Sequence, residues 1–264
     1  MPDESVSIEQ TGGLGPITVL LPPDKLSLTP ASYMAVRAIG RNRHLLSGNG
    51  IDWGSGSGCL AIAAAKLEAV ERIVGLELAQ EDVAVARQNA IANGVLGKVA
   101  FLHADSFAPF SEEDVGALDV LAGSTDFLIA NPPASQGDDG LGWRRRVLED
   151  ARRFLVSGAP VLLQISYQYG QPRIRKLAED VPGYRYEGVL ASTDWVPFDQ
   201  ERSDLASQLE EYGAEEERGG LAYTFPDPER PDWGHINARQ ALAYHRSTGM
   251  SPLSKWQMHL FRRI

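Results

Sequence analysis

Short apolar runs alternate with segments of helical periodicity along most of the chain. Runs rich in Val, Ile and Leu predict buried strands, and the segments between them predict helices. The expected strands are residues 50–52, 72–78, 98–105, 126–131, 160–167, 184–190 and 255–262. The expected helices are residues 59–67, 80–93, 143–155 and 172–179. This alternation predicts an α/β fold, with a doubly wound, mostly parallel sheet and helices on both of its faces.

Two regions lie outside this alternation. Residues 1–47 predict an N-terminal extension that starts poorly ordered through residue 16, continues as a strand at 17–21, and ends in a helix capped by Thr29 with Pro30 at its first position. Residues 194–254 are too many for a bare loop, so they predict an insertion with helical pieces at 203–212 and 236–246. The expected core is therefore residues 48–193 together with 255–264.

Composition is that of an ordinary globular protein. Hydrophobic residues make up 43% of the 264 residues, and no apolar run approaches the roughly 20 residues of a membrane span. The acidic start, Met1 to Ser5, lacks the apolar segment of a signal peptide. The single cysteine, Cys59, can form no intramolecular disulfide. We therefore expect a cytoplasmic protein that does not bind membranes.

The charge of the chain indicates which kinds of partner it can bind. The formal net charge of −10 disfavours a protein that binds by neutralising many phosphates, so nucleic acid is not the expected partner. The insertion concentrates the negative charge, with 12 acidic residues against five arginines. Another group of arginines at 144–146, 152 and 153 predicts a solvated helix face rather than a patch for an acidic substrate. The five histidines show no metal-ligand spacing, so no metal site is predicted.

A glycine-rich turn follows the first core strand. Asp52 ends that strand, and Gly54, Gly56 and Gly58 follow at every second position before an Ala-rich helix. Glycine permits the positive φ angles of a sharp turn and lets a ligand approach the backbone. A dinucleotide-binding turn would have its third glycine, or an alanine, where this chain has Cys59. The turn thus favours a nucleoside ligand without a pyrophosphate, and a turn without a ligand is the alternative.

Polar side chains also end the neighbouring strands. Glu77 ends the second core strand, Asp105 the third and Asn131 the fourth. Ligands of open parallel sheets bind beyond the carboxyl ends of the strands, so these side chains are expected around one cleft. Each acid alone is more often a solvated strand end. Their joint occurrence favours a binding site.

Asn131 begins the triplet Asn131-Pro132-Pro133. The two prolines fix φ and remove donors, so the segment presents its carbonyl oxygens outward. The side-chain carbonyl of Asn131 and the backbone carbonyl of Pro132 can each accept a hydrogen from one planar amino group. That arrangement would aim the nitrogen lone pair at a methyl donor, so catalysis would consist mainly of positioning. A rigid turn without chemistry is the alternative.

These motifs, in this order over residues 48–134, resemble the class I S-adenosylmethionine-dependent methyltransferases, especially the HemK-type and related small-domain N-methyltransferases. The resemblance implies a Rossmann-like sheet whose last strand is antiparallel, S-adenosylmethionine as the cofactor, and methyl transfer to nitrogen. It implies Asn131 and Pro132 as catalytic residues. The cofactor-binding residues that it implies are Asp52, Gly54, Ser55, Gly56, Gly58, Glu77, Leu78, Asp105, Ser106 and Asn131.

The carboxylates have separate roles in this interpretation. Glu77 would accept hydrogen bonds from both ribose hydroxyls, because a carboxylate has two oxygens. Asp105 would accept from the adenine amino group, with the backbone N–H of Ser106 close to the ring. Asp52 would lie near the ammonium group of the cofactor, in direct contact or through water.

The resemblance does not identify the methyl acceptor. Ala134 stands where the family usually has an aromatic residue that stacks on the acceptor. We expect a protein side chain or a small molecule, held by Pro133, Ala134 and the insertion aromatics Trp195, Phe198 and Trp233. The acids of the insertion would favour a cationic acceptor. A nucleic-acid base methyltransferase and a cofactor-binding subunit without activity are the alternatives.

Overall fold

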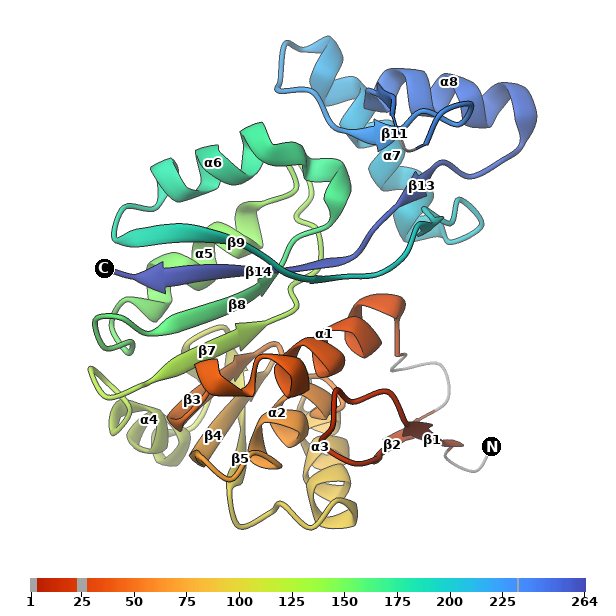
Figure 1. Ribbon diagram of the computed structural model, residues 1–264. Coiled ribbons are helices and arrows are strands. Elements are labelled where there is room, and N and C mark those ends of the chain that lie inside the picture. The colour runs from red at the N-terminus through yellow and green to blue at the C-terminus, as the bar shows by residue number, and fades with distance from the viewer. Residues whose placement is uncertain (1–3, 23–27, 232) are drawn as a thin grey trace.

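The computed structural model describes residues 4–22, 28–231 and 233–264. Its centre is an eight-stranded sheet with the strand order β6-β5-β4-β3-β7-β8-β14-β9 (Figure 1). The strands are β3 (Gly48–Trp53), β4 (Val70–Glu77), β5 (Val99–Asp105), β6 (Ala108–Pro109), β7 (Phe127–Ala130), β8 (Pro160–Gln164), β9 (Tyr184–Ser192) and β14 (Gln257–Arg263). Strands β5, β4, β3, β7 and β8 pair in parallel, whereas β14 is antiparallel to both β8 and β9. The expected α/β class and antiparallel last strand are confirmed.

Helices cover both faces of the sheet. The helices are α1 (Pro30–Arg41), α2 (Cys59–Ala65), α3 (Gln80–Ala92), α4 (Glu112–Asp119), α5 (Gly142–Ala151) and α6 (Gly170–Asp180), with short 3-10 turns η1 (Arg43–Leu45) and η2 (Tyr167–Tyr169). Strand β7 shows how the sequence specifies two cores. Phe127 and Ile129 are buried with residues of α1, α2 and α3, while Leu128 and Ala130 are buried with residues of α4, α5 and α6. Alternate side chains of a strand point to opposite faces, so this wholly apolar strand fills both cores.

The acidic segment between β5 and β7, expected as a linker, contains helix α4. The hydroxyl of Ser111 caps the helix by accepting a hydrogen bond from the backbone N–H of Asp114 at 3.1 Å. Glu112 and Glu113 lie in the first turn, where negative charge interacts favourably with the helix dipole. The acids that indicated a linker therefore support a helix start.

From Glu4 on, the N-terminal extension begins with a hairpin rather than a poorly ordered segment, and residues 1–3 lie outside the described residues. Strand β1 (Glu4–Ile8) pairs antiparallel with β2 (Ile17–Leu21). Val19 and Ile8 are buried, and the side chain of Asn89 on α3 both donates to and accepts from the backbone of Leu20. These contacts fix the hairpin to the core. Helix α1 starts as expected, with Thr29 as its cap and a proline at its first position.

The segment between β9 and β14 has its own secondary structure and lies beyond one end of the sheet (Figure 1). Its elements are β10 (Val196–Pro197), α7 (Ser203–Glu217), β11 (Phe225–Pro226), β12 (His235–Ile236), α8 (Ala238–Thr248) and β13 (Leu253–Ser254). Buried aromatic residues, including Phe198 and Tyr212, join it to the core shared with α5 and α6. Within the described ranges, no helix has both the length and the apolar character needed to cross a bilayer.

Candidate functional site

The glycine turn connects β3 to α2 through three residues with positive φ angles. These angles are +68° at Gly54, +50° at Gly56 and +80° at Gly58, all in the region that favours glycine. A Cβ atom at Gly54 would meet no atom within 4 Å, whereas one at Gly58 would lie 2.7 Å from the ring of Phe101. Gly54 thus leaves open space for a ligand. Gly58 instead allows α2 to pack closely on the sheet.

Glu77 connects the end of β4 to this turn. Its carboxylate accepts hydrogen bonds from the backbone N–H of Gly56 at 2.7 Å and of Ala79 at 3.0 Å. Each oxygen keeps further acceptor capacity, because a carboxylate has about four acceptor sites. Glu77 can therefore hold the turn and still accept from a ligand.

A cavity of about 290 Å³, which we call the glycine-turn cavity, opens beside Gly54 at the carboxyl ends of β3, β4 and β5. Of the residues expected to bind the cofactor, it is lined by Gly54, Glu77, Leu78, Asp105 and Ser106. The remaining lining residues are Trp53, Leu76, Ala104, Pro133 and Trp143. Its volume is near the lower end of the range for small-ligand sites, roughly 300–1,000 Å³.

Asp52 lies beneath the turn, outside the lining of this cavity. Its Oδ2 accepts a hydrogen bond from the backbone N–H of Ala61 at 3.0 Å, and its Oδ1 has no partner among the described residues. Burial raises the pKa of the Asp52 carboxyl to about 7, because a charged group is disfavoured away from water. Ser55, Gly56 and Gly58 also lie outside the lining and shape the turn from below.

Asp105 and Ser106 lie at the end of β5. The Asp105 carboxylate is half exposed and pairs with Arg146 of α5, with 3.2 Å between Oδ1 and Nη1. Ser106 has a φ of +58°, and its hydroxyl accepts a hydrogen bond from the indole N–H of Trp53 at 2.7 Å. A non-glycine residue with this φ is uncommon and is often found at functional sites. Both side chains are thus fixed at the rim of the cavity.

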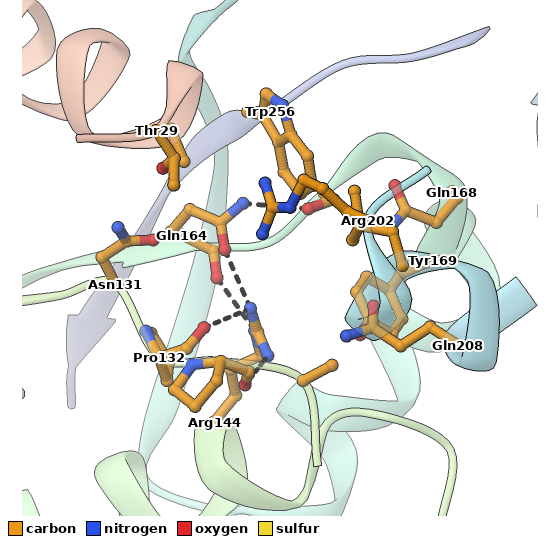
Figure 2. A pocket seen from close by; sticks show the side chains of 15 residues that line it. Thr29, Asn131, Pro132, Arg144, Gln164, Gln168, Tyr169, Arg202, Gln208 and Trp256 are labelled. Carbon is orange, nitrogen blue, oxygen red and sulfur yellow. Dashed lines mark hydrogen bonds between the residues drawn. The ribbon is translucent and has the colours of Figure 1, made fainter. Parts of the chain in front are cut away.

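A second cavity of about 260 Å³, which we call the Asn131 cavity, has the Asn131 triplet in its lining (Figure 2). Five groups of residues line it: Thr29 and Ala31 at the start of α1; Asn131, Pro132, Pro133 and Ala134 after β7; Arg144 on α5; Gln164, Ser166, Gln168 and Tyr169 at and after the end of β8; and Arg202, Leu205, Gln208 and Trp256 from the segment before β14. Pro133 lines both cavities, so they adjoin at the triplet.

Arg144 fixes the triplet from below, contrary to the expectation of a solvated helix face. Its guanidinium is buried and donates to the carbonyl oxygens of Pro132 at 2.9 Å and Pro133 at 2.8 Å. It also donates to the backbone carbonyl of Gln164 at 2.9 Å, to the side-chain oxygen of Gln164 at 2.8 Å, and to the carbonyl of Gly140 at 3.4 Å. Burial lowers the pKa of Arg144. All these acceptors are neutral, so this buried cation binds carbonyls instead of a carboxylate.

Two other arginines, Arg145 on α5 and Arg153 just beyond its end, form ion pairs. Arg145 pairs with Asp139, and Arg153 pairs with Asp119 at 2.8 Å. The side chain of Arg153 is 60% exposed. The expectation of solvated arginines therefore holds for Arg153 but not for Arg144.

The three insertion aromatics lie outside the lining of the Asn131 cavity. Phe198 is fully buried and packs on Tyr212 and Phe225, Trp233 is 89% exposed, and Trp195 packs edge-on against Tyr167 at 5.0 Å. They were expected to line it because aromatic residues often stack on ligands. The insertion contributes Arg202, directly before α7, and the α7 residues Leu205 and Gln208 instead. Leu205 and Gln208 are three residues apart, a spacing that places side chains on one helix face.

The described acids of the insertion also lie elsewhere. Glu215 pairs with the buried Arg173 at 3.0 Å, and Glu216 accepts from the backbone N–H groups of Tyr223, Ala238 and Arg239. Glu215 thus joins α7 to α6, and Glu216 holds together α7, α8 and the connection between them. Among the described side chains, the lining of the Asn131 cavity includes two arginines and no carboxylate, which does not favour a cationic acceptor.

The strand order, the antiparallel β14 and the two cavities at the strand ends define the class I methyltransferase fold. Residues 27–183, more than half of the chain, match the family model described as the methyltransferase small domain. The chain belongs to this family, and its HemK-type character is confirmed by the relatives. A solved methyltransferase structure from Pyrococcus furiosus is 21% identical to this chain and superposes with a TM-score of 0.51. The matched region covers 67% of this chain and 82% of that protein, so the two share the fold.

Curated relatives include release factor glutamine methyltransferases and a ribosomal protein L11 methyltransferase. The release factor glutamine methyltransferase of Thermodesulfovibrio yellowstonii is 26% identical over 161 residues, which are 52% of this chain and 54% of that protein. That of Bacillus cereus is 28% identical over 161 residues, 53% of each chain. The ribosomal protein L11 methyltransferase of Photobacterium profundum is 40% identical over 73 residues, 28% of this chain and 24% of that protein. The chain thus spans about half the length of the release factor enzymes.

Proposed function

We propose that this chain is an S-adenosylmethionine-dependent methyltransferase that methylates the side-chain amide nitrogen of a protein. One observation supports this most strongly: the glycine-turn cavity and the Asn131 cavity adjoin at Pro133, with Asn131 in the lining of the second. A cofactor in the first and an acceptor in the second would meet at the triplet. The names of the relatives agree with a protein acceptor.

The glycine-turn cavity suits the nucleoside part of the cofactor. Glu77 offers carboxylate oxygens for ribose hydroxyls, Leu78 an apolar surface for adenine, and Gly54 an open approach to the turn. The buried Asp52 carboxyl lies beneath the turn, where its ionised form would attract the ammonium group of the cofactor. When bound, the cofactor supplies a methyl group on a positively charged sulfur.

At the acceptor end, Asn131 and Pro132 orient the amide. The Asn131 side-chain oxygen and the Pro132 carbonyl can each accept one hydrogen of an –NH2 group. The Pro132 carbonyl already accepts from Arg144 but has a second lone pair. The nearby charge of Arg144 favours a neutral amide over an ammonium group. Trp256 lines the same cavity and supplies a flat aromatic surface that Ala134 does not.

A methyl-transfer assay tests this proposal. Release factor and ribosomal protein L11 from Bacillus cereus are incubated with the chain and tritiated S-adenosylmethionine, and labelled peptides are located by mass spectrometry. We expect label on a side-chain amide with the wild type and none with Asn131→Ala. Label on lysine amines, or equal labelling by Asn131→Ala, would contradict the assigned chemistry.

A further inference from the structure

Trp143 is an aromatic residue of the glycine-turn cavity that none of the cofactor motifs includes. It is the second residue of α5, the helix that follows the triplet, and its half-buried side chain lines the cavity with Glu77 and Asp105. The next residue, Arg144, lines the Asn131 cavity. Consecutive residues of α5 therefore reach the two cavities on either side of Pro133.

The surroundings of Trp143 hold its ring at this position. The ring centre lies 6.2 Å from that of Trp53, at an angle of 44°. The Arg146 guanidinium lies 5.6 Å from the Trp143 ring centre and also pairs with Asp105. Among the described residues, the indole N–H of Trp143 has no hydrogen-bond partner, whereas that of Trp53 donates to Ser106. Trp143 thus offers both a flat surface and an available donor.

We infer that Trp143 is a cofactor-binding residue whose indole stacks on the adenine ring. The inference rests on the proposed function, because it assumes a nucleoside in the glycine-turn cavity. Adenine is flat and aromatic, so it can stack on an aromatic side chain, a contact that strengthens the binding of any base. Leu78, which is 62% exposed, offers another apolar surface at the same cavity. A bound adenine would cover both residues.

Calorimetry with S-adenosylhomocysteine and with adenosine tests this role without knowledge of the acceptor. Trp143→Ala and Trp143→Leu should weaken the binding of both ligands by roughly tenfold, about 1.4 kcal/mol. Trp143→Phe keeps a flat ring and should bind within about threefold of the wild type. Leucine keeps an apolar side chain but has no flat ring. Comparison of Trp143→Leu with Trp143→Phe therefore distinguishes ring stacking from apolar packing in general. Thermal unfolding without ligand identifies any variant that fails to fold.

Two failures are distinguishable. A wild type that binds neither ligand would overturn both this inference and the proposed function. A wild type that binds S-adenosylhomocysteine, together with unchanged affinity in folded Trp143→Leu, would overturn this inference alone. Equal weakening by Trp143→Phe and Trp143→Leu would exclude ring stacking as the cause.

Discussion

Replacement of Arg144 by methionine should both destabilise the protein and slow methyl transfer. The change removes the guanidinium and keeps an unbranched side chain. The carbonyls of Pro132 and Pro133 and the side-chain oxygen of Gln164 would then lose their only partner among the described residues. Each buried acceptor without a partner costs about 1–3 kcal/mol. All three residues line the Asn131 cavity, where water can donate some of the missing hydrogen bonds. We therefore expect the free energy of unfolding to fall by about 3 kcal/mol in total.

Circular dichroism during heating measures this effect. A loss of about 3 kcal/mol lowers the Tm of a domain of this size by roughly 6–12 °C. Arg153→Met, two residues beyond the end of α5, is the matched control, because the Arg153 side chain is 60% exposed and its ion pair is worth at most about 1 kcal/mol. Arg144→Lys keeps the charge but has three donors in place of five, so its Tm should fall between those of the wild type and Arg144→Met.

Turnover provides the second readout for Arg144. A displacement of the triplet by about 1 Å would misalign the acceptor and reduce turnover roughly a hundredfold. Binding of S-adenosylhomocysteine should change little, because Arg144 does not line the glycine-turn cavity. If Arg144→Met has the Tm and turnover of Arg153→Met, Arg144 does not position the triplet.

Three further predictions concern the carboxylates and Asn131. Glu77→Ala should weaken S-adenosylhomocysteine binding by about 1.5–3 kcal/mol in calorimetry, whereas Glu112→Ala on α4 should not; equal affinities would remove Glu77 from the site. Asn131→Ala should lower kcat and leave the Kd of S-adenosylhomocysteine within about threefold, and an unchanged kcat would contradict its role. The pKa of Asp52 in the folded protein, about 7, lies above its ordinary value of 3.8, so its burial destabilises the protein increasingly as the pH rises from about 4 through 7. Asp52→Asn should therefore raise the Tm more at pH 8 than at pH 5, and an equal change at both pH values would disprove this link.

Periodicity and strand-end chemistry were sufficient to predict the sheet and the position of the cleft. The strand ends at Glu77, Asp105 and Asn131 do meet at the edge where the two cavities lie. This succeeded because parallel strands place their carboxyl ends together, whatever the rest of the chain does. The second strand of the hairpin follows from the apolar run 17–21, but Val6 and Ile8 alternate with serines over too few residues to predict the first strand.

The surroundings of the triplet were harder to predict. Arg144 was placed with its exposed neighbours because of its charge, although Val147, Leu148 and Ala151 lie three, four and seven residues further on the same buried face. That spacing was the available signal for its burial. No comparable spacing predicts the burial of Phe198. Its side chain is buried only when α7 and β11 fold against α5 and α6.

The turn from Gly54 to Gly58 and the carboxylate of Glu77 are proposed to hold the nucleoside of a methyl donor. Isothermal titration of the wild-type chain with S-adenosylhomocysteine and, separately, with NAD measures this binding. We expect saturable binding of one S-adenosylhomocysteine per chain and much weaker binding of NAD. No binding of S-adenosylhomocysteine, or tighter binding of NAD, would contradict this proposal.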